Sequence, residues 1–201
     1  MAMISALLIA FVISETLSNE EISECLKKCI TPLARLERSF HYVFSNYEQV
    51  CDVLDTGAYC VRKCTTEEQQ KFYQYTTFFR IHCVDYEENI EPHLPCLQNA
   101  AKDSDAVCKD RCHSGYSFDK GAKKEEKMKI GCLSLECSTV CYFQEFVAAC
   151  PEAEDALLKL NIGQIHSITQ TIHPISFERM SQECRNIHDT DYMKRKLLAI
   201  E

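Results

Sequence analysis

Fourteen cysteines constrain the fold of this 201-residue chain more than any other feature, because eight of them form four pairs at one repeated spacing. Three residues separate the members of each pair: Cys25/Cys29, Cys60/Cys64, Cys108/Cys112 and Cys137/Cys141. On an α-helix, residues four positions apart lie on one face, one turn apart, with parallel side chains. A disulfide within such a pair would be strained. We therefore expect each pair to tie one helix to its neighbours at two successive turns.

Structural disulfides are favoured over two other uses of cysteine. Zinc sites have tighter cysteine pairs or histidines at ligand spacing, whereas His82, His93 and His113 are isolated. A thioredoxin-like redox site needs two residues between its cysteines, a spacing that this sequence lacks. We expect no metal and no cofactor. The even cysteine count predicts seven bridges, whose connectivity stays open, and they would also include Cys51, Cys83, Cys96, Cys132, Cys150 and Cys184.

The first residues predict an extracellular destination. Met3–Ile13 is an uncharged apolar run of eleven residues, too short for a transmembrane helix and typical in length of a signal-peptide core. Cleavage would follow Ser14 or Ser18, so we assign 1–18 to a signal peptide. No Lys or Arg precedes the run, and a buried N-terminal helix is the alternative. We expect a secreted protein with no membrane span after signal removal.

Composition favours helices. The chain has only five glycines, five prolines and no tryptophan, few helix breakers for its length. Apolar and cysteine positions recur every three or four residues over 26–54 and again over 72–90, as on one face of a helix. We predict an all-α, disulfide-stapled helical bundle of about six to eight helices. The net charge of −8 argues against nucleic-acid binding, which requires a basic surface.

The stretch 113–131 is rich in glycine and charge and predicts a linker or mobile loop. It would separate a cysteine-rich helical domain at 19–112 from a C-terminal helical region at 132–201. Nine cysteines precede this stretch and five follow it. Because both counts are odd, at least one bridge must join the two parts if every cysteine pairs. Near the start of the chain, a cysteine pair is followed by the lone Cys51 and then by a second pair. From Cys108 onward the same order recurs around the lone Cys132, which suggests an internal duplication.

Local signals place the ends of the helices. Thr31 and Pro32 predict a break in the first long stretch, and Thr65 with Glu68 matches a capping box at the start of the second. Pro92 should end that second helix. Further helices are expected over Pro95–Ala101, Ser104–Cys112 (capped by Asp103 or Ser104), Lys124–Cys150, Glu152–Leu160 and from Ser176 onward.

One segment was tested for catalytic chemistry. Cys184–Tyr192 resembles the histidine–aspartate helix of secreted phospholipase A2, in which His188 would be the general base and Asp189 the calcium ligand. Arg185 and Asp191 stand where that family has cysteines, and the upstream stretch has no glycine from which to form a calcium loop. We therefore predict that the protein is not an enzyme.

The segment from Cys25 to Cys112 resembles the chondroitin proteoglycan 4 domain of nematode secreted proteins. The likeness rests on the two opening pairs, the lone Cys51 and Cys83, the tripeptide Pro95–Leu97 and the closing pair. The T20D4.11-like domain, another nematode cysteine-rich family, is the alternative. The resemblance implies a secreted, extracellular protein, and neither family is characterised as an enzyme.

Three functions are therefore considered. A secreted non-catalytic module that binds an extracellular protein or matrix partner comes first. A carrier of a small hydrophobic ligand is the second, because the aromatic-rich stretch 71–83 could line a pocket, although core packing explains it best. A chondroitin-bearing core protein is the third. Chondroitin attaches at Ser-Gly sites, and Ser114 provides the one such site in the sequence.

Overall fold

The computed structural model describes residues 22–113 and 123–199, and within them every regular element is a helix. The all-α class is confirmed. Six of the described helices have eight residues or more, and shorter ones connect them. The helices are α2 (Glu24–Ile30), α3 (Phe40–Ser45), α4 (Tyr47–Val61), α5 (Thr66–Tyr75), α6 (Thr77–Arg80), α7 (Glu87–Ile90), α8 (Leu94–His113), α9 (Lys124–Ala149), α10 (Glu154–Thr171), α11 (Pro174–Glu178), α12 (Gln182–Asn186) and α13 (Thr190–Leu197).

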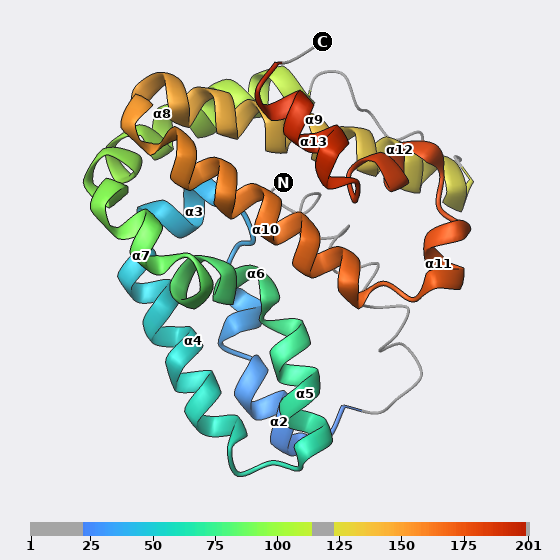
Figure 1. Ribbon diagram of the computed structural model, residues 1–201. Helices are drawn as coiled ribbons and strands as arrows, with labels where there is room; N and C mark the ends of the chain where they lie inside the picture. Colours follow the sequence, from blue (N-terminus) through green and yellow to red (C-terminus); the bar gives the residue numbers. More distant parts are fainter. Residues whose placement is uncertain (1–21, 114–122, 200–201) are drawn as a thin grey trace.

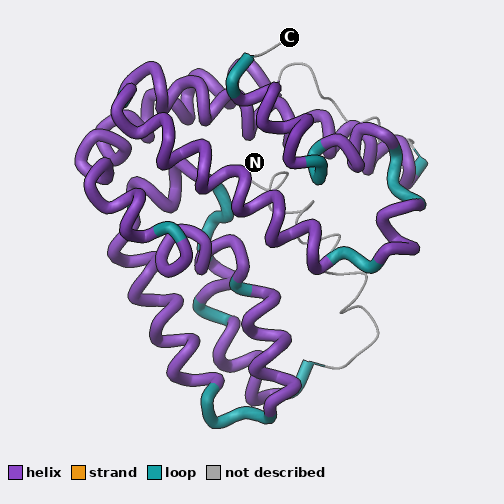
Figure 2. Tube along the Cα trace, in the orientation of Figure 1, coloured by secondary structure: helices purple, strands orange, loops and turns teal. Residues whose placement is uncertain are grey.

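The helices form an arm and a larger body (Figures 1 and 2). In the arm, α2, α4 and α5 pack side by side. In the body, α8 packs lengthwise on α9, and α3 packs against α8. Helix α10 contacts α6 and α7 on one side and α9 and α13 on the other, so it connects the arm's end to the C-terminal helices.

All fourteen cysteines are joined in seven disulfides, and none is free. The cysteine pair in α2 bonds to the pair at the end of α4. The cysteine pair in α8 bonds to the pair in α9. Each couple is therefore held at two successive turns, as the spacing predicts. The bridges are Cys25–Cys64, Cys29–Cys60, Cys51–Cys83, Cys96–Cys150, Cys108–Cys141, Cys112–Cys137 and Cys132–Cys184.

The two halves share one connectivity. In each half the two pairs bond to each other in antiparallel order, and the lone cysteine between them bonds to a cysteine further along the chain. Three bridges cross the stretch 113–131, starting from Cys96, Cys108 and Cys112. The N-terminal and C-terminal regions are thus covalently one body, as the odd counts require.

The linker is shorter than the predicted 113–131. His113 ends α8, and α9 already begins at Lys124, so 124–131 form the first turns of a long helix. Residues 114–122 lie outside the described residues, and so does the predicted signal peptide at 1–18. No helix in 22–113 or 123–199 is long and apolar enough to cross a membrane.

The main core is aromatic and joins both halves. Phe44 of α3 and Phe146 of α9 are fully buried, with ring centroids 5.1 Å apart in an edge-to-face arrangement. Phe79, from the aromatic-rich stretch, is also fully buried. Such pairs contribute about 0.5–1.5 kcal/mol beyond the area they bury. Core packing therefore accounts for the aromatic residues of α6.

Four helix predictions were wrong in detail. The helix expected over Glu152–Leu160 is α10, which begins at Glu154 and continues to Thr171. The two short helices expected over 95–112 form one continuous helix, α8, in which Ser104 is buried rather than capping. The helix expected over 66–90 is divided into α5, α6, a π-helical segment (Ile81–Asp85) and α7. The helix expected from Ser176 is three short helices, α11 to α13. The break near Pro32 is confirmed, since α2 ends at Ile30.

The capping box at the start of α5 is confirmed and gives a first prediction. The Thr65 Oγ1 accepts a hydrogen bond from the Glu68 amide (3.3 Å), and the Glu68 carboxylate accepts one from the Thr65 amide (2.7 Å). Thr65→Ala removes one half of this exchange, so we expect the free energy of unfolding to fall by about 1 kcal/mol in urea titrations. Thr66→Ala, one residue further on, is the control, and an equal loss in both variants would contradict the capping role.

Candidate functional site

A second, smaller core lies beside the aromatic one, between α9, α10 and the C-terminal helices. Its buried members are Cys132, Ile165, Cys184, Ile187 and Met193. The bridge Cys132–Cys184 holds α12 against α9 through the middle of this cluster. Aliphatic and sulfur-containing side chains form it, in contrast to the aromatic main core.

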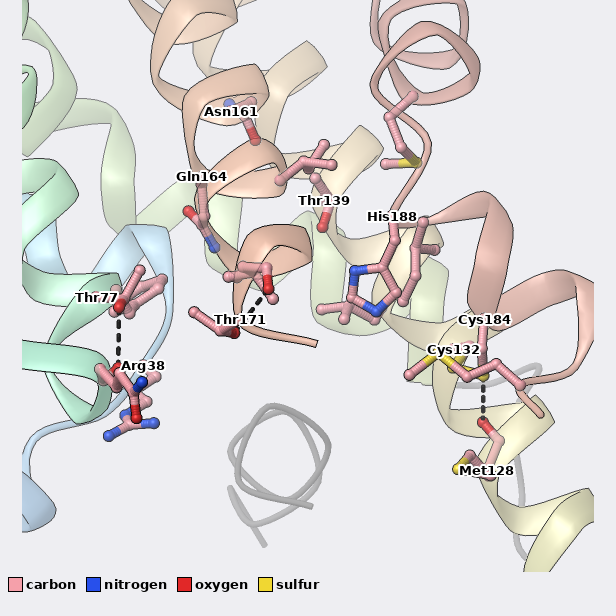
Figure 3. A pocket seen from close by; sticks show the side chains of 18 of the residues that line it. Arg38, Thr77, Met128, Cys132, Thr139, Asn161, Gln164, Thr171, Cys184 and His188 are labelled. Carbon is pink, nitrogen blue, oxygen red and sulfur yellow. Dashed lines mark hydrogen bonds between the residues drawn. A yellow bond between two sulfur atoms is a disulfide. The ribbon is translucent and has the colours of Figure 1, made fainter. Parts of the chain in front are cut away.

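This second core encloses a pocket (Figure 3) with a cavity volume of about 100 Å³. Helices α9 and α10 and the segment 180–193 form most of its wall, and residues 74–78 together with Arg38 close it from the side of the arm. Drug-sized ligands occupy roughly 300–1,000 Å³, so the pocket suits only a small molecule or part of a larger one. If the protein carries a hydrophobic ligand, as the second hypothesis from the sequence holds, this volume limits the enclosed part of that ligand to a small group.

Three polar side chains in the pocket wall define its chemistry. The Oε1 of Gln164 is buried and has no hydrogen-bond partner among the described residues. The imidazole of His188 faces the pocket (Figure 3), and burial lowers its pKa to about 4, so the ring is neutral near pH 7. Arg38 lies at the far side of the pocket from Cys132–Cys184. Its guanidinium donates to the Tyr75 carbonyl (3.1 Å) and stacks on the Tyr75 ring, 4.5 Å from the centroid.

The segment that resembles phospholipase has different roles here. Only His188 of that segment's two candidate residues faces the pocket. The Asp189 carboxylate accepts a hydrogen bond from the Tyr192 amide (2.9 Å) and caps α13. The structure thus gives Asp189 a helix-capping contact and places His188 at the pocket wall.

The fourteen cysteines lie in bridges, which removes them as metal ligands. The sulfurs of Cys25 and Cys64 approach Glu68, and those of Cys96 and Cys150 approach Glu152, but a bridged sulfur carries no thiolate charge with which to bind a metal. Ser114, the predicted glycan attachment site, lies outside the described residues.

The pattern of bridges and helices invites comparison with known families. A family model described as chondroitin proteoglycan 4 matches residues 15–195. The chain belongs to this family. The match extends well past Cys112, where the sequence resemblance was expected to end, and so includes both halves of the bridge pattern. Searches of curated proteins and of solved structures found no match.

Beyond the pocket, this chondroitin proteoglycan 4 domain contains one partly buried polar cluster. The Asp105 carboxylate of α8 accepts hydrogen bonds from Tyr142 (2.6 Å) and Lys109 (2.6 Å) and lies 3.1 Å from the His41 Nδ1 of α3. Burial lowers the pKa of His41. Burial also raises the pKa of Tyr142, and the Asp105 carboxylate raises it further. The cluster ties α3, α8 and α9 together, and we assign it a structural role.

The sequence did not distinguish His82, which is completely buried in the fold of this chain. Its Nδ1 lies 2.8 Å from the Phe78 carbonyl, its Nε2 has no partner among the described residues, and three phenylalanines surround it: Phe40, Phe44 and Phe78. Burial lowers the pKa of His82 to about 4. The folded protein therefore holds this ring neutral at pH values where an unfolded chain would protonate it.

A pH dependence follows from His82. Between an unfolded pKa of about 6.5 and the folded pKa of about 4, the unfolded state binds the extra proton, so stability falls as pH falls through this window. The full difference corresponds to about 3 kcal/mol for His82. In urea titrations from pH 7 to pH 4, His82→Phe should lose less stability than the native protein, whatever its absolute stability. His166→Gln, at an exposed position, is the control; parallel curves for all three proteins would contradict this assignment.

Proposed function

We propose that this protein is a secreted, non-catalytic scaffold that acts as an extracellular interaction or matrix module. The observation that carries this proposal is the complete pairing of its cysteines in seven disulfides. Such bridges form and persist in oxidising compartments. With no free thiol and with helices tied at successive turns, the chain is suited to present a fixed surface rather than to perform chemistry.

Two exposed tyrosine–arginine contacts are candidate binding points on that surface. Tyr59 is 64% exposed and lies beside Arg62, and Tyr73 is 58% exposed and stacks under Arg80, 3.4 Å from the ring centroid. Tyrosine and arginine are enriched among the residues that dominate binding energy at protein interfaces. The bridge at Cys60 holds the Tyr59 contact rigid, which lowers the entropy lost on binding.

The test is retention on extracellular matrix from the source tissue. The secreted protein should bind saturably, and reduced, alkylated protein should not. The double variants Tyr59→Ala/Arg62→Ala and Tyr73→Ala/Arg80→Ala each remove one of the two contacts. We expect at least one of these variants to be retained about tenfold more weakly than the native protein. Glu152→Ala, on the exposed surface elsewhere, is the control. No saturable retention, or equal retention of folded and reduced protein, would overturn the proposal.

A chondroitin-bearing core protein is a second candidate, supported by the family match. Ser114 has an acidic residue nearby on each side in the sequence, Asp110 and Asp119. If Ser114 carries a chondroitin chain, chondroitinase should increase the electrophoretic mobility of the secreted protein. Ser114→Ala should abolish that shift. A mobility unchanged by the enzyme would exclude this candidate and leave the interaction module unaffected.

A further inference from the structure

The pocket in the second core contains an unusual concentration of methionine. Met128, Met180 and Met193 all line it, and the chain's other two methionines are Met1 and Met3. Methionine side chains are flexible and polarisable and adapt their shape to apolar ligands. Ile165 and Ile168 complete an apolar wall along α10. The pocket is therefore built to accept an apolar group of variable shape.

The charge in the pocket wall is positive and comes from one arginine. Arg38 is the single charged side chain among the described residues that line it, and no aspartate or glutamate is among them. This contrasts with the chain as a whole, which has a net charge of −8. Among the described residues, the Arg38 guanidinium contacts the Tyr75 carbonyl, the Tyr75 side chain and the Phe79 ring. None of these groups neutralises its charge.

A partly buried cation without a carboxylate partner is stabilised by an anion. Burial lowers the pKa of Arg38, because removing the guanidinium from water disfavours its charged form. An arginine–carboxylate pair forms two parallel hydrogen bonds and is stronger than a hydrogen bond between neutral groups. An anionic group at this end of the pocket would therefore gain both hydrogen bonds and charge neutralisation.

Size limits the ligand further. A cavity of about 150 Å³ lined by apolar residues binds benzene, and this pocket has about 100 Å³, so it encloses a ligand of no more than about four carbon atoms. Arg38 and the Cys132–Cys184 bridge lie at opposite sides of it (Figure 3). A ligand with its charge at Arg38 would place its apolar part among the methionines, and the unpartnered Gln164 Oε1 could accept a hydrogen bond from a hydroxyl group on it.

We propose that this pocket binds a small amphipathic carboxylic acid of about four carbon atoms, with its carboxylate on Arg38 and its apolar chain between α9, α10 and the C-terminal helices. This binding site goes beyond the extracellular module proposed above and does not depend on it. A protein that binds no matrix could still bind such an acid, and the two tests are independent.

The NMR signals of the methionine methyl groups report on ligand binding in this pocket. In the full-length oxidised protein labelled with ¹³C-methyl methionine, titration with butanoate should shift the methyl signals of Met128, Met180 and Met193 saturably. Butan-1-ol has the same chain without the charge, so we expect it to bind about tenfold more weakly, a difference typical of losing a charge-assisted hydrogen bond. Unshifted methionine signals, or equal affinity for the acid and the alcohol, would overturn the proposal.

Variants of Arg38 assign the charge to this side chain. Arg38→Gln should weaken butanoate binding about tenfold and leave butan-1-ol binding unchanged, whereas Arg38→Lys should retain part of the butanoate affinity. Arg35→Gln, at an exposed position outside the pocket, is the matched control and should bind as the native protein does. If Arg38→Gln does not fold, Arg38→Lys and the comparison of the acid with the alcohol still test whether Arg38 binds the carboxylate. Native-like butanoate affinity in Arg38→Gln would contradict the assignment.

Discussion

Replacing Phe146 with alanine is expected to lower the free energy of unfolding by about 4 kcal/mol, the middle of the range for truncating a buried phenylalanine. Phe146 is 1% exposed, and its ring contacts Phe44 edge-to-face at 5.1 Å and stacks with Tyr142 at 6.4 Å. The seven bridges hold the surrounding helices in place, so the cavity cannot collapse freely and most of the cost should remain. Urea unfolding of the oxidised protein measures it.

The control is Tyr59→Ala, which truncates an aromatic side chain that is 64% exposed. Because this side chain buries little apolar area, we expect its removal to change the free energy of unfolding by less than about 0.5 kcal/mol. A similar loss in both variants would mean that the aromatic core contributes little beyond the bridges. A loss near 4 kcal/mol in Phe146→Ala alone supports a core that both halves share.

Removing the bridge of the second core is the second large effect. Cys132→Ala/Cys184→Ala opens a loop of 52 residues, and the chain-entropy relation gives a loss of about 4 kcal/mol for a loop of this size. It is the one disulfide that ties the chain beyond Cys150 to the rest. Hydrogen exchange should therefore show lost protection across α12 and α13, while α8 keeps its protection.

The matched control is Cys29→Ala/Cys60→Ala. The neighbouring bridge Cys25–Cys64 still closes the same pair of helices one turn away, so the loop that is released is short. We expect the loss of stability to be smaller by about 1 kcal/mol, because loop entropy grows with loop length. We also expect α12 and α13 to retain their protection. Global loss of protection in both variants would show that the second core is not a separate cooperative unit.

The bridge framework was largely predictable from the sequence. The spacing of Cys25/Cys29 and Cys60/Cys64 excludes bonds within a pair and requires bonds to a neighbouring helix, which the structure confirms. The odd counts on either side of 113–131 required a crossing bridge, and the structure has three. The connectivity itself was not predictable, because it depends on which helices become neighbours in space.

Helix ends were predictable only where local chemistry decides them. The capping box at Thr65 is local, and it forms as expected. Ser104 also reads as a cap, yet its side chain is buried inside a continuous helix, since α8 packs lengthwise on α9 and gains more from unbroken contact. Tertiary packing overrides a local helix-start signal in this case.

The pocket could not have been found from the sequence. Arg38, Met128 and His188 are far apart along the chain, and their proximity depends on how α10 and the C-terminal segment pack on α9. The sequence contained one indirect signal: beyond the first three residues, methionine occurs only between positions 128 and 193. The aromatic-rich stretch 71–83 serves both purposes considered for it: Phe72 and Phe79 are buried in the main core, whereas Tyr75 and Phe78 line the pocket.

Disulfide mapping by mass spectrometry of the full-length, non-reduced protein tests the central claim most directly. Proteolysis between the cysteines should yield seven cross-linked peptide pairs, with Cys25–Cys64 and Cys29–Cys60 in one couple of helices and Cys108–Cys141 and Cys112–Cys137 in the other. The same spectra should show no free thiol. Unmodified cysteines numbering near fourteen, or bonds within the four-residue pairs, would contradict a helical scaffold held by bridges between neighbouring helices.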